Sequence, residues 1–85
     1  MAGNSIIVYG TTWCGDCHSA KRVLDEYAVA YTWIDVDADP EAEALVLRVN
    51  RGMRSVPTIV FPDGSVLVEP SDQMLSEQLE KLASA

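Results

Sequence analysis

The chain has 85 residues, of which 48% are hydrophobic, and a formal net charge of −7. This length corresponds to one domain, near the lower limit at which a hydrophobic core holds a fold without disulfides or metals. The acidic balance argues against nucleic acid and anionic membranes as partners, because both require a cationic surface.

A signal peptide carries positive charge before its apolar run, and the N-terminus of this chain carries none there. No apolar run approaches the roughly 20 residues that span a bilayer. We therefore expect a single domain over residues 1–85, monomeric and located in the cytoplasm.

The first half of the chain predicts a strand, a helix and a second strand. Residues 5–9 (SIIVY) form a short β-branched run that indicates a buried strand. Residues 30–36 alternate between apolar and polar side chains and predict another strand. Between them, apolar residues recur at the 3-4-3 spacing of an amphipathic helix, with a buried stripe at Cys17, Ala20, Val23, Leu24 and Tyr27.

A second helix and a hairpin follow. Asp39 suits the N-cap of this helix, Pro40 its first turn, and Gly52 a left-handed residue at its end. Residues 57–61 and 65–69 are apolar and flank a Pro-Asp-Gly turn, which predicts an antiparallel hairpin.

A third helix closes the chain. Ser71 suits its N-cap, and the apolar stripe falls at Leu75, Leu79 and Leu82. The element order is therefore β-α-β-α-β-β-α, in which the β-α-β unit requires parallel strands and the hairpin antiparallel ones. This order predicts an α/β fold in which three helices flank one mixed four-stranded sheet.

The two cysteines, Cys14 and Cys17, have the C-x-x-C spacing of a redox dithiol. Because the first strand passes directly into the predicted helix, Cys14 lies at a helix N-terminus, where free N–H groups and the helix dipole favour a thiolate. Cys17 lies one turn later on the core-facing stripe. This placement predicts an exposed attacking sulfur and a shielded resolving sulfur.

The same residues permit other sites. With His18 the spacing becomes C-x-x-C-H, which attaches c-type haem, and Met53 or Met74 would then be an axial ligand. The predicted strands argue against this class, since its small members are helical. A zinc or iron–sulfur site through the cysteines is a further alternative, although structural zinc requires four ligands. We expect His18 to face solvent, and no bound metal or cofactor.

Residues 54–58 (RSVPT) form the second motif. A cis Val56–Pro57 bond would present the backbone of Val56 beside the thiols, where an extended substrate would pair with it. A trans proline that opens an edge strand agrees equally well with the sequence. Arg54 is placed to meet a substrate carboxylate or hydroxyl group.

Together, the segment Trp13-Cys14-Gly15-Asp16-Cys17, the Val56-Pro57 turn and the Asp63-Gly64-Ser65 hairpin resemble the glutaredoxins, and most closely their mycoredoxin subgroup. The resemblance covers nearly the whole chain. It implies a thioredoxin-like fold, with the first strand between the second and third and with a cis Pro57.

The resemblance also implies an activity. It is that of a thiol–disulfide oxidoreductase that reduces mixed disulfides between proteins and a low-molecular-weight thiol, such as mycothiol or glutathione. The small thiol is then a co-substrate with its own reductase. The alternative within this fold is a redoxin that reduces protein disulfides directly and is recharged by a flavoprotein reductase.

Roles for individual residues follow from the same resemblance. Cys14 attacks, and Cys17 either resolves or stays idle while a second small thiol regenerates Cys14. The resemblance implies that Val56 and Pro57 line the substrate groove and that Ser71 and Asp72 hold the polar end of the small thiol. Trp13, beside the nucleophile, and Arg54 complete the expected substrate-binding residues. The chain departs from the family pattern at Asp16, where relatives usually carry an aromatic residue or proline. A carboxylate opposes ionisation of a neighbouring thiol, so Asp16 is expected to make the thiolate of Cys14 less favoured.

Overall fold

The computed structural model describes residues 5–84, which form one sheet and three helices. The sheet has the order β2-β1-β3-β4. β1 and β2 are parallel, whereas β3 is antiparallel to both β1 and β4. These elements confirm the predicted thioredoxin-like fold, and their bounds are β1 (Ile6–Gly10), α1 (Gly15–Glu26), β2 (Tyr31–Asp35), α2 (Pro40–Val49), β3 (Thr58–Val60), β4 (Val66–Val68) and α3 (Asp72–Ser84).

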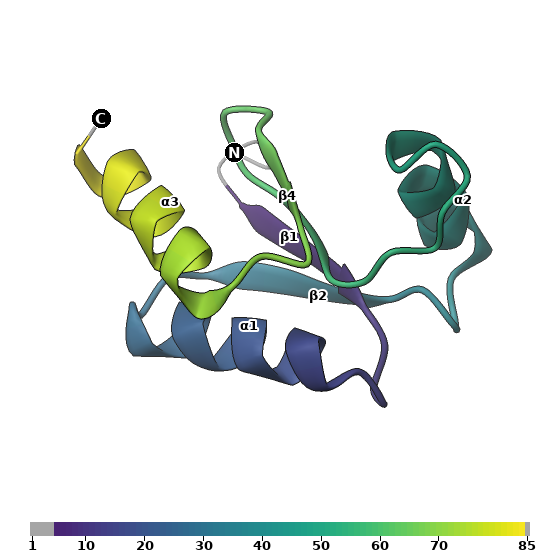
Figure 1. Cartoon of the computed structure of the whole chain (residues 1–85), viewed down its shortest axis with the longest axis horizontal. Coiled ribbons are helices and arrows are strands. Elements are labelled where there is room, and N and C mark those ends of the chain that lie inside the picture. The colour runs from purple at the N-terminus through teal and green to yellow at the C-terminus, as the bar shows by residue number, and fades with distance from the viewer. Residues whose placement is uncertain (1–4, 85) are drawn as a thin grey trace.

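The sheet separates two layers of helix, because successive side chains of a strand point to opposite faces. Figure 1 shows α2 on one side of the molecule, apart from α1 and α3. Ile6 and Val8 of β1 pack with α1 and α3, whereas Tyr9 packs with Val36 and Val46 beneath α2. Across residues 5–84, none of these helices has both the length and the apolar character needed to cross a membrane.

Two helix ends differ from the prediction. Tyr27 was expected on the buried stripe of the first helix, but it follows α1 and is 37% exposed. Its hydroxyl donates a 2.8 Å hydrogen bond to Glu80 of α3, because a side chain beyond the last turn is free to reach the neighbouring helix. α2 ends at Val49, before Gly52, and Arg51 between them is also left-handed (φ 57°). Gly52 itself is left-handed (φ 88°), as predicted.

Candidate active site

Cys14 is the N-cap residue of α1, as the sequence predicted. Its sulfur accepts a hydrogen bond from the backbone N–H of Cys17, with a distance of 3.2 Å. The sulfur thus occupies the position of the oxygen that caps other helices, where negative charge is stabilised. The predicted exposure of this sulfur is wrong: Cys14 is only 9% exposed, and its thiol donates to the carbonyl oxygen of Val56 at 3.8 Å.

Cys17 is fully buried, as its position on the apolar stripe predicted. Burial is the largest cause that raises the pKa of Cys17 to about 12, and the hydrogen bond with Cys14 acts in the same direction. A backbone hydrogen bond with Thr11 acts against them. With a pKa of about 12, Cys17 is a protonated thiol at neutral pH, and it lies one helical turn from Cys14.

The turn before β3 brings Val56 and Pro57 to Cys14. The peptide bond between these two residues is cis, as the family resemblance implied. Pro57 is buried, whereas Val56 is partly exposed. Since the carbonyl oxygen of Val56 lies 3.8 Å from the sulfur of Cys14, residues more than forty positions apart meet at the end of the sheet.

A short hydrogen-bond network ties this turn to α2. The hydroxyl of the buried Thr58 donates to the carbonyl oxygen of Ser55 at 2.7 Å and accepts from Nδ2 of Asn50 at 3.1 Å. Asn50 also donates to the carbonyl oxygen of Val46 at 2.9 Å. No role was expected for Asn50 or Thr58 from the sequence, although polar residues on either side of a proline turn are a usable signal.

Trp13, directly before Cys14, is 68% exposed and is held by a chain of polar side chains. Its indole Nε1 donates a 2.8 Å hydrogen bond to Oδ2 of Asp37. Arg54 pairs with Oδ1 of Asp37 and, at 2.6 Å, with Glu43. The hydrogen bonds from Trp13 and then from Arg54 lower the pKa of the Asp37 carboxyl below its usual value. No motif in the sequence singles out Asp37, which lies in the loop between β2 and α2.

Ser71 and Asp72 lie at the start of α3. The hydroxyl oxygen of Ser71 accepts a 3.1 Å hydrogen bond from the N–H of Met74, which confirms the predicted N-cap. Asp72 forms a 2.8 Å ion pair with Arg22 of α1. Both residues are exposed, and these contacts join the first turn of α3 to α1 rather than to either cysteine.

Asp16 and His18 are the remaining polar residues of the C-x-x-C-H segment. Asp16 is exposed in the first turn of α1, and its charge is among the smaller causes that raise the pKa of Cys17. His18 faces solvent as predicted, with its Nε2 2.7 Å from the carbonyl oxygen of Thr12. Within the described residues, no group of three or more His, Cys, Asp or Glu side chains is arranged to hold a metal ion.

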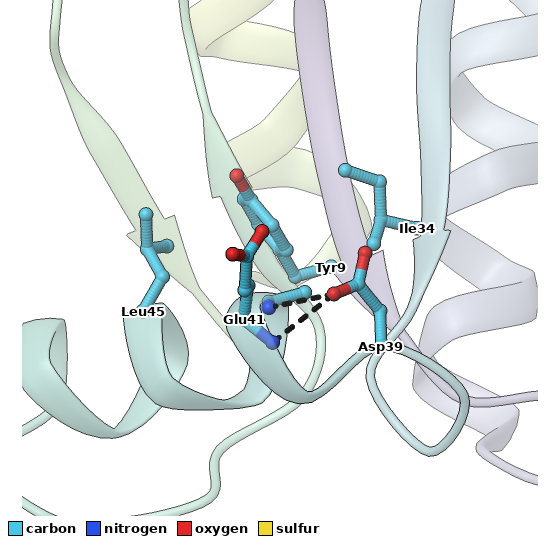
Figure 2. Close-up of a pocket in the computed structure, with 6 residues that line it drawn as sticks. Tyr9, Ile34, Asp39, Glu41 and Leu45 are labelled. Atoms are coloured by element: carbon cyan, nitrogen blue, oxygen red, sulfur yellow. Dashed lines mark hydrogen bonds between the residues drawn. The ribbon is translucent and has the colours of Figure 1, made fainter.

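A separate pocket lies on the face of the sheet that α2 covers (Figure 2). One of its two carboxylates is that of Asp39, whose Oδ1 accepts hydrogen bonds of 3.1 Å from the N–H groups of Glu41 and Ala42. This carboxylate is therefore committed to capping α2. The pocket residues are Tyr9, Ile34, Asp39, Glu41, Ala42 and Leu45.

The chain is similar to known redox proteins along most of its length. A family model described as glutaredoxin matches residues 6–67. Mycoredoxin 1 of Corynebacterium glutamicum is 38% identical over 80 residues, which are 94% of this chain and 99% of that protein.

Solved structures of redox proteins are also similar to the chain. NrdH-redoxin from Escherichia coli, described as a glutaredoxin-like protein with a thioredoxin-like activity profile, is 29% identical with a TM-score of 0.71, covering 86% of this chain and 92% of its own. A buckwheat glutaredoxin in complex with glutathione is 25% identical with a TM-score of 0.71, and the match covers 95% of this chain and 74% of the buckwheat chain. With its C-x-x-C pair at the N-terminus of α1 and a cis proline beside it, the chain belongs to the glutaredoxin family of thiol–disulfide oxidoreductases.

Proposed function

We propose that the protein reduces mixed disulfides between other proteins and a low-molecular-weight thiol of the mycothiol or glutathione type. One observation carries the proposal: the sulfur of Cys14, at the N-terminus of α1, lies 3.8 Å from the backbone of Val56. A nucleophile and a backbone edge suited to pairing with an extended substrate are therefore adjacent. Similarity to a mycoredoxin and to a glutaredoxin bound to glutathione supports this substrate class.

The reaction begins with the thiolate of Cys14, which the N–H of Cys17 stabilises through its hydrogen bond to the sulfur. The thiolate attacks the small-thiol sulfur of the mixed disulfide. A disulfide between Cys14 and the small thiol forms, and the protein sulfur leaves as a thiolate that takes a proton from water. A second small thiol then attacks this disulfide, restores the Cys14 thiolate and leaves as a symmetrical disulfide for its reductase.

We assign the protein-binding part of the groove to Trp13, Val56 and Pro57. The exposed indole of Trp13 offers a large apolar surface beside the nucleophile, and aromatic side chains commonly anchor protein contacts. The backbone of Val56 would pair with the substrate chain as an added strand does.

The polar end of the small thiol is assigned to Arg54, Ser71 and Asp72. Arg54 and Asp72 are both ion-paired within the chain, but their pairs are solvent-exposed and so hold them only weakly. A ligand carboxylate or amine can exchange with these partners. Ser71 adds a hydroxyl at the positive end of the α3 dipole.

The experiment offers one model protein as its mixed disulfide with glutathione, mycothiol or bacillithiol, each with the matching reduced thiol and reductase. We expect one small thiol to support turnover at least about tenfold faster than the others, since polar recognition of a thiol's head group is worth more than about 1.4 kcal/mol. If none of the three substrates is reduced faster than by the Cys14→Ser variant, the proposed function is wrong.

Direct reduction of protein disulfides by the Cys14–Cys17 pair is the second candidate. It is favoured by the similarity to NrdH-redoxin, described with a thioredoxin-like activity profile. A test supplies a protein with an intramolecular disulfide together with a flavoprotein reductase and no small thiol. Turnover there that is lost in Cys17→Ser would identify this activity.

We also propose that the enzyme works as a monomer in the cytoplasm. In a reducing compartment a C-x-x-C pair such as Cys14 and Cys17 is more often catalytic than structural. Sedimentation of the purified protein tests the monomeric state, and fractionation of cells tests the cytoplasmic location.

A further inference from the structure

Gly10, the last residue of β1, is approached closely by two side chains. A methyl group at its Cα would lie 2.6 Å from Cη2 and 2.8 Å from Cζ3 of Trp33, and 2.7 Å from the sulfur of Cys17. These distances are shorter than any ordinary contact, so the indole edge and the sulfur both lie in the space that a side chain would fill. The glycine is therefore needed for space.

Trp33 reaches this space from β2, the edge strand that runs parallel to β1. Its Cα is in register with that of Val8, so Gly10 is its diagonal neighbour on the α1 face of the sheet. Lys21 of α1 lies over the indole, with its Nζ 4.4 Å from the ring centroid, in a cation–π arrangement. The ring is therefore held between the sheet and α1, beside Cys17.

The position of Trp33 beside Cys17 matters because a buried thiol is a poor nucleophile. Cys17 has no exposed surface, so ionisation of its thiol to the reactive thiolate is unfavourable. The indole edge of Trp33 and the sulfur of Cys17 both lie within 2.8 Å of the point that a side-chain carbon on Gly10 would occupy, so the indole borders this sulfur from the edge strand.

We propose that Trp33, seated in the space left by Gly10, is a positioning residue that shields the sulfur of Cys17 and slows its attack on the mixed disulfide at Cys14. This inference rests on the proposed thiol–disulfide activity and adds which of two routes the enzyme takes. The shielding gives a second small thiol time to resolve Cys14, so it favours the monothiol route.

The slowed step is a thiol–disulfide exchange. The sulfur of Cys17 forms a bond with that of Cys14, and the bond between Cys14 and the small thiol breaks. The small thiol leaves as a thiolate, and the proton of Cys17 goes to water. Cys17 is oxidised and the small thiol is reduced, so no further oxidant is required.

The first experiment measures the reactivity of Cys17 alone, in the Cys14→Ser background, by its rate of alkylation with iodoacetamide across a range of pH. Trp33→Leu should raise the rate at pH 8 about tenfold or more and move the profile to lower pH, because one pKa unit corresponds to a factor of ten in thiolate. Thr32→Ala, at an exposed position of the same strand, is the matched control and should change nothing.

Equal alkylation rates in the Trp33→Leu and Thr32→Ala proteins would overturn the shielding role. Trp33→Phe is the second variant, for use if Trp33→Leu loses its far-ultraviolet circular dichroism. The smaller ring lacks the indole atoms that approach Gly10, so it should give an intermediate rate.

The second experiment follows the intramolecular step. Protein with both cysteines is loaded at Cys14 with glutathione disulfide, and the lifetime of the mixed disulfide is measured by mass spectrometry. Trp33→Leu should shorten this lifetime about tenfold, in parallel with the greater thiolate fraction of Cys17. An unchanged lifetime would contradict the proposal.

Failure of the proposed enzymatic function and failure of the shielding role are distinguishable. Alkylation of Cys17 needs no turnover, so its result stands even if the protein does not reduce mixed disulfides.

A third measurement tests the contact itself. Gly10→Ala should lower the denaturant midpoint in the wild-type background and lower it less in the Trp33→Leu background, since the smaller side chain vacates part of the space. Equal shifts in both backgrounds would show that Gly10 and Trp33 do not interact in this way.

Discussion

The indole N–H of Trp13 donates a 2.8 Å hydrogen bond to Asp37, 24 residues later in the chain. Asp37 is in turn paired with Arg54, which also pairs with Glu43 of α2. The residue that precedes the nucleophile is thus connected to the segment that leads into the cis-proline turn. An exposed tryptophan beside an active site would otherwise be free to rotate.

This relationship predicts a pH dependence for the indole of Trp13. The pKa of Asp37 is lowered in the folded protein, so its ionised form and the hydrogen bond persist through the usual aspartate range and are lost only at a lower pH. We expect the indole N–H resonance of Trp13 in NMR spectra to stay constant on acidification through the usual titration range of an aspartate and to shift only below that range. The resonance of Trp33 is the internal control.

In Arg54→Gln the midpoint of the Trp13 shift should move to higher pH, because the ion pair contributes to the lowered pKa of Asp37. In Asp37→Ala the transition should vanish. A transition that survives Asp37→Ala would assign the shift to another group.

The two cysteines should separate in function. Cys14→Ser should lower the rate of mixed-disulfide reduction by about a thousandfold or more, since an alcohol does not replace a thiolate nucleophile. Cys17→Ser should retain turnover with a small thiol, because that route needs only Cys14. The measurement is the steady-state rate with a protein mixed disulfide, and full activity of Cys14→Ser would exclude Cys14 as the nucleophile.

Asp16 should slow the reaction of Cys14 with electrophiles. Its carboxylate is exposed in the first turn of α1, two residues after Cys14, and like charges at such short range repel. Asp16→Asn should raise the alkylation rate of Cys14 about two- to fivefold at low ionic strength, and less at 1 M salt, where charges are screened within about 3 Å. Asp25→Asn, near the other end of α1, is the control. A rate that falls in Asp16→Asn would mean that the carboxylate stabilises the helix end more than it opposes the thiolate.

Thr58 should support both stability and substrate binding. Thr58→Val keeps the shape of the side chain but leaves the carbonyl of Ser55 and the amide of Asn50 without this partner. Loss of a buried hydrogen bond of this kind costs about 1–3 kcal/mol, which urea unfolding would measure. The KM for the protein substrate should also rise in Thr58→Val, because the same hydrogen-bond network anchors the turn at Val56. Thr32→Val, at an exposed position, should leave both quantities unchanged.

The sequence alone determined the element order, the helix N-caps and the positions of both cysteines relative to α1. These features follow from local rules: apolar periodicity, the preference of Asp39 and Ser71 for N-caps, and the passage of a strand into a helix at Cys14. The cis state of Pro57 was left open by the residues and came from the family resemblance, because both isomers agree with a proline before a strand.

Tertiary structure alone decided the low exposure of Cys14, the partners of Arg54 and the contact between Gly10, Trp33 and Cys17. Each depends on residues far apart in sequence. Asp37 and Glu43 meet Arg54 only when the loop before α2 folds towards the cis-proline turn. Trp33 meets Gly10 only through the parallel register of β1 and β2, because hydrophobic periodicity assigns a residue to a face of the sheet but does not say which residue of the neighbouring strand lies beside it.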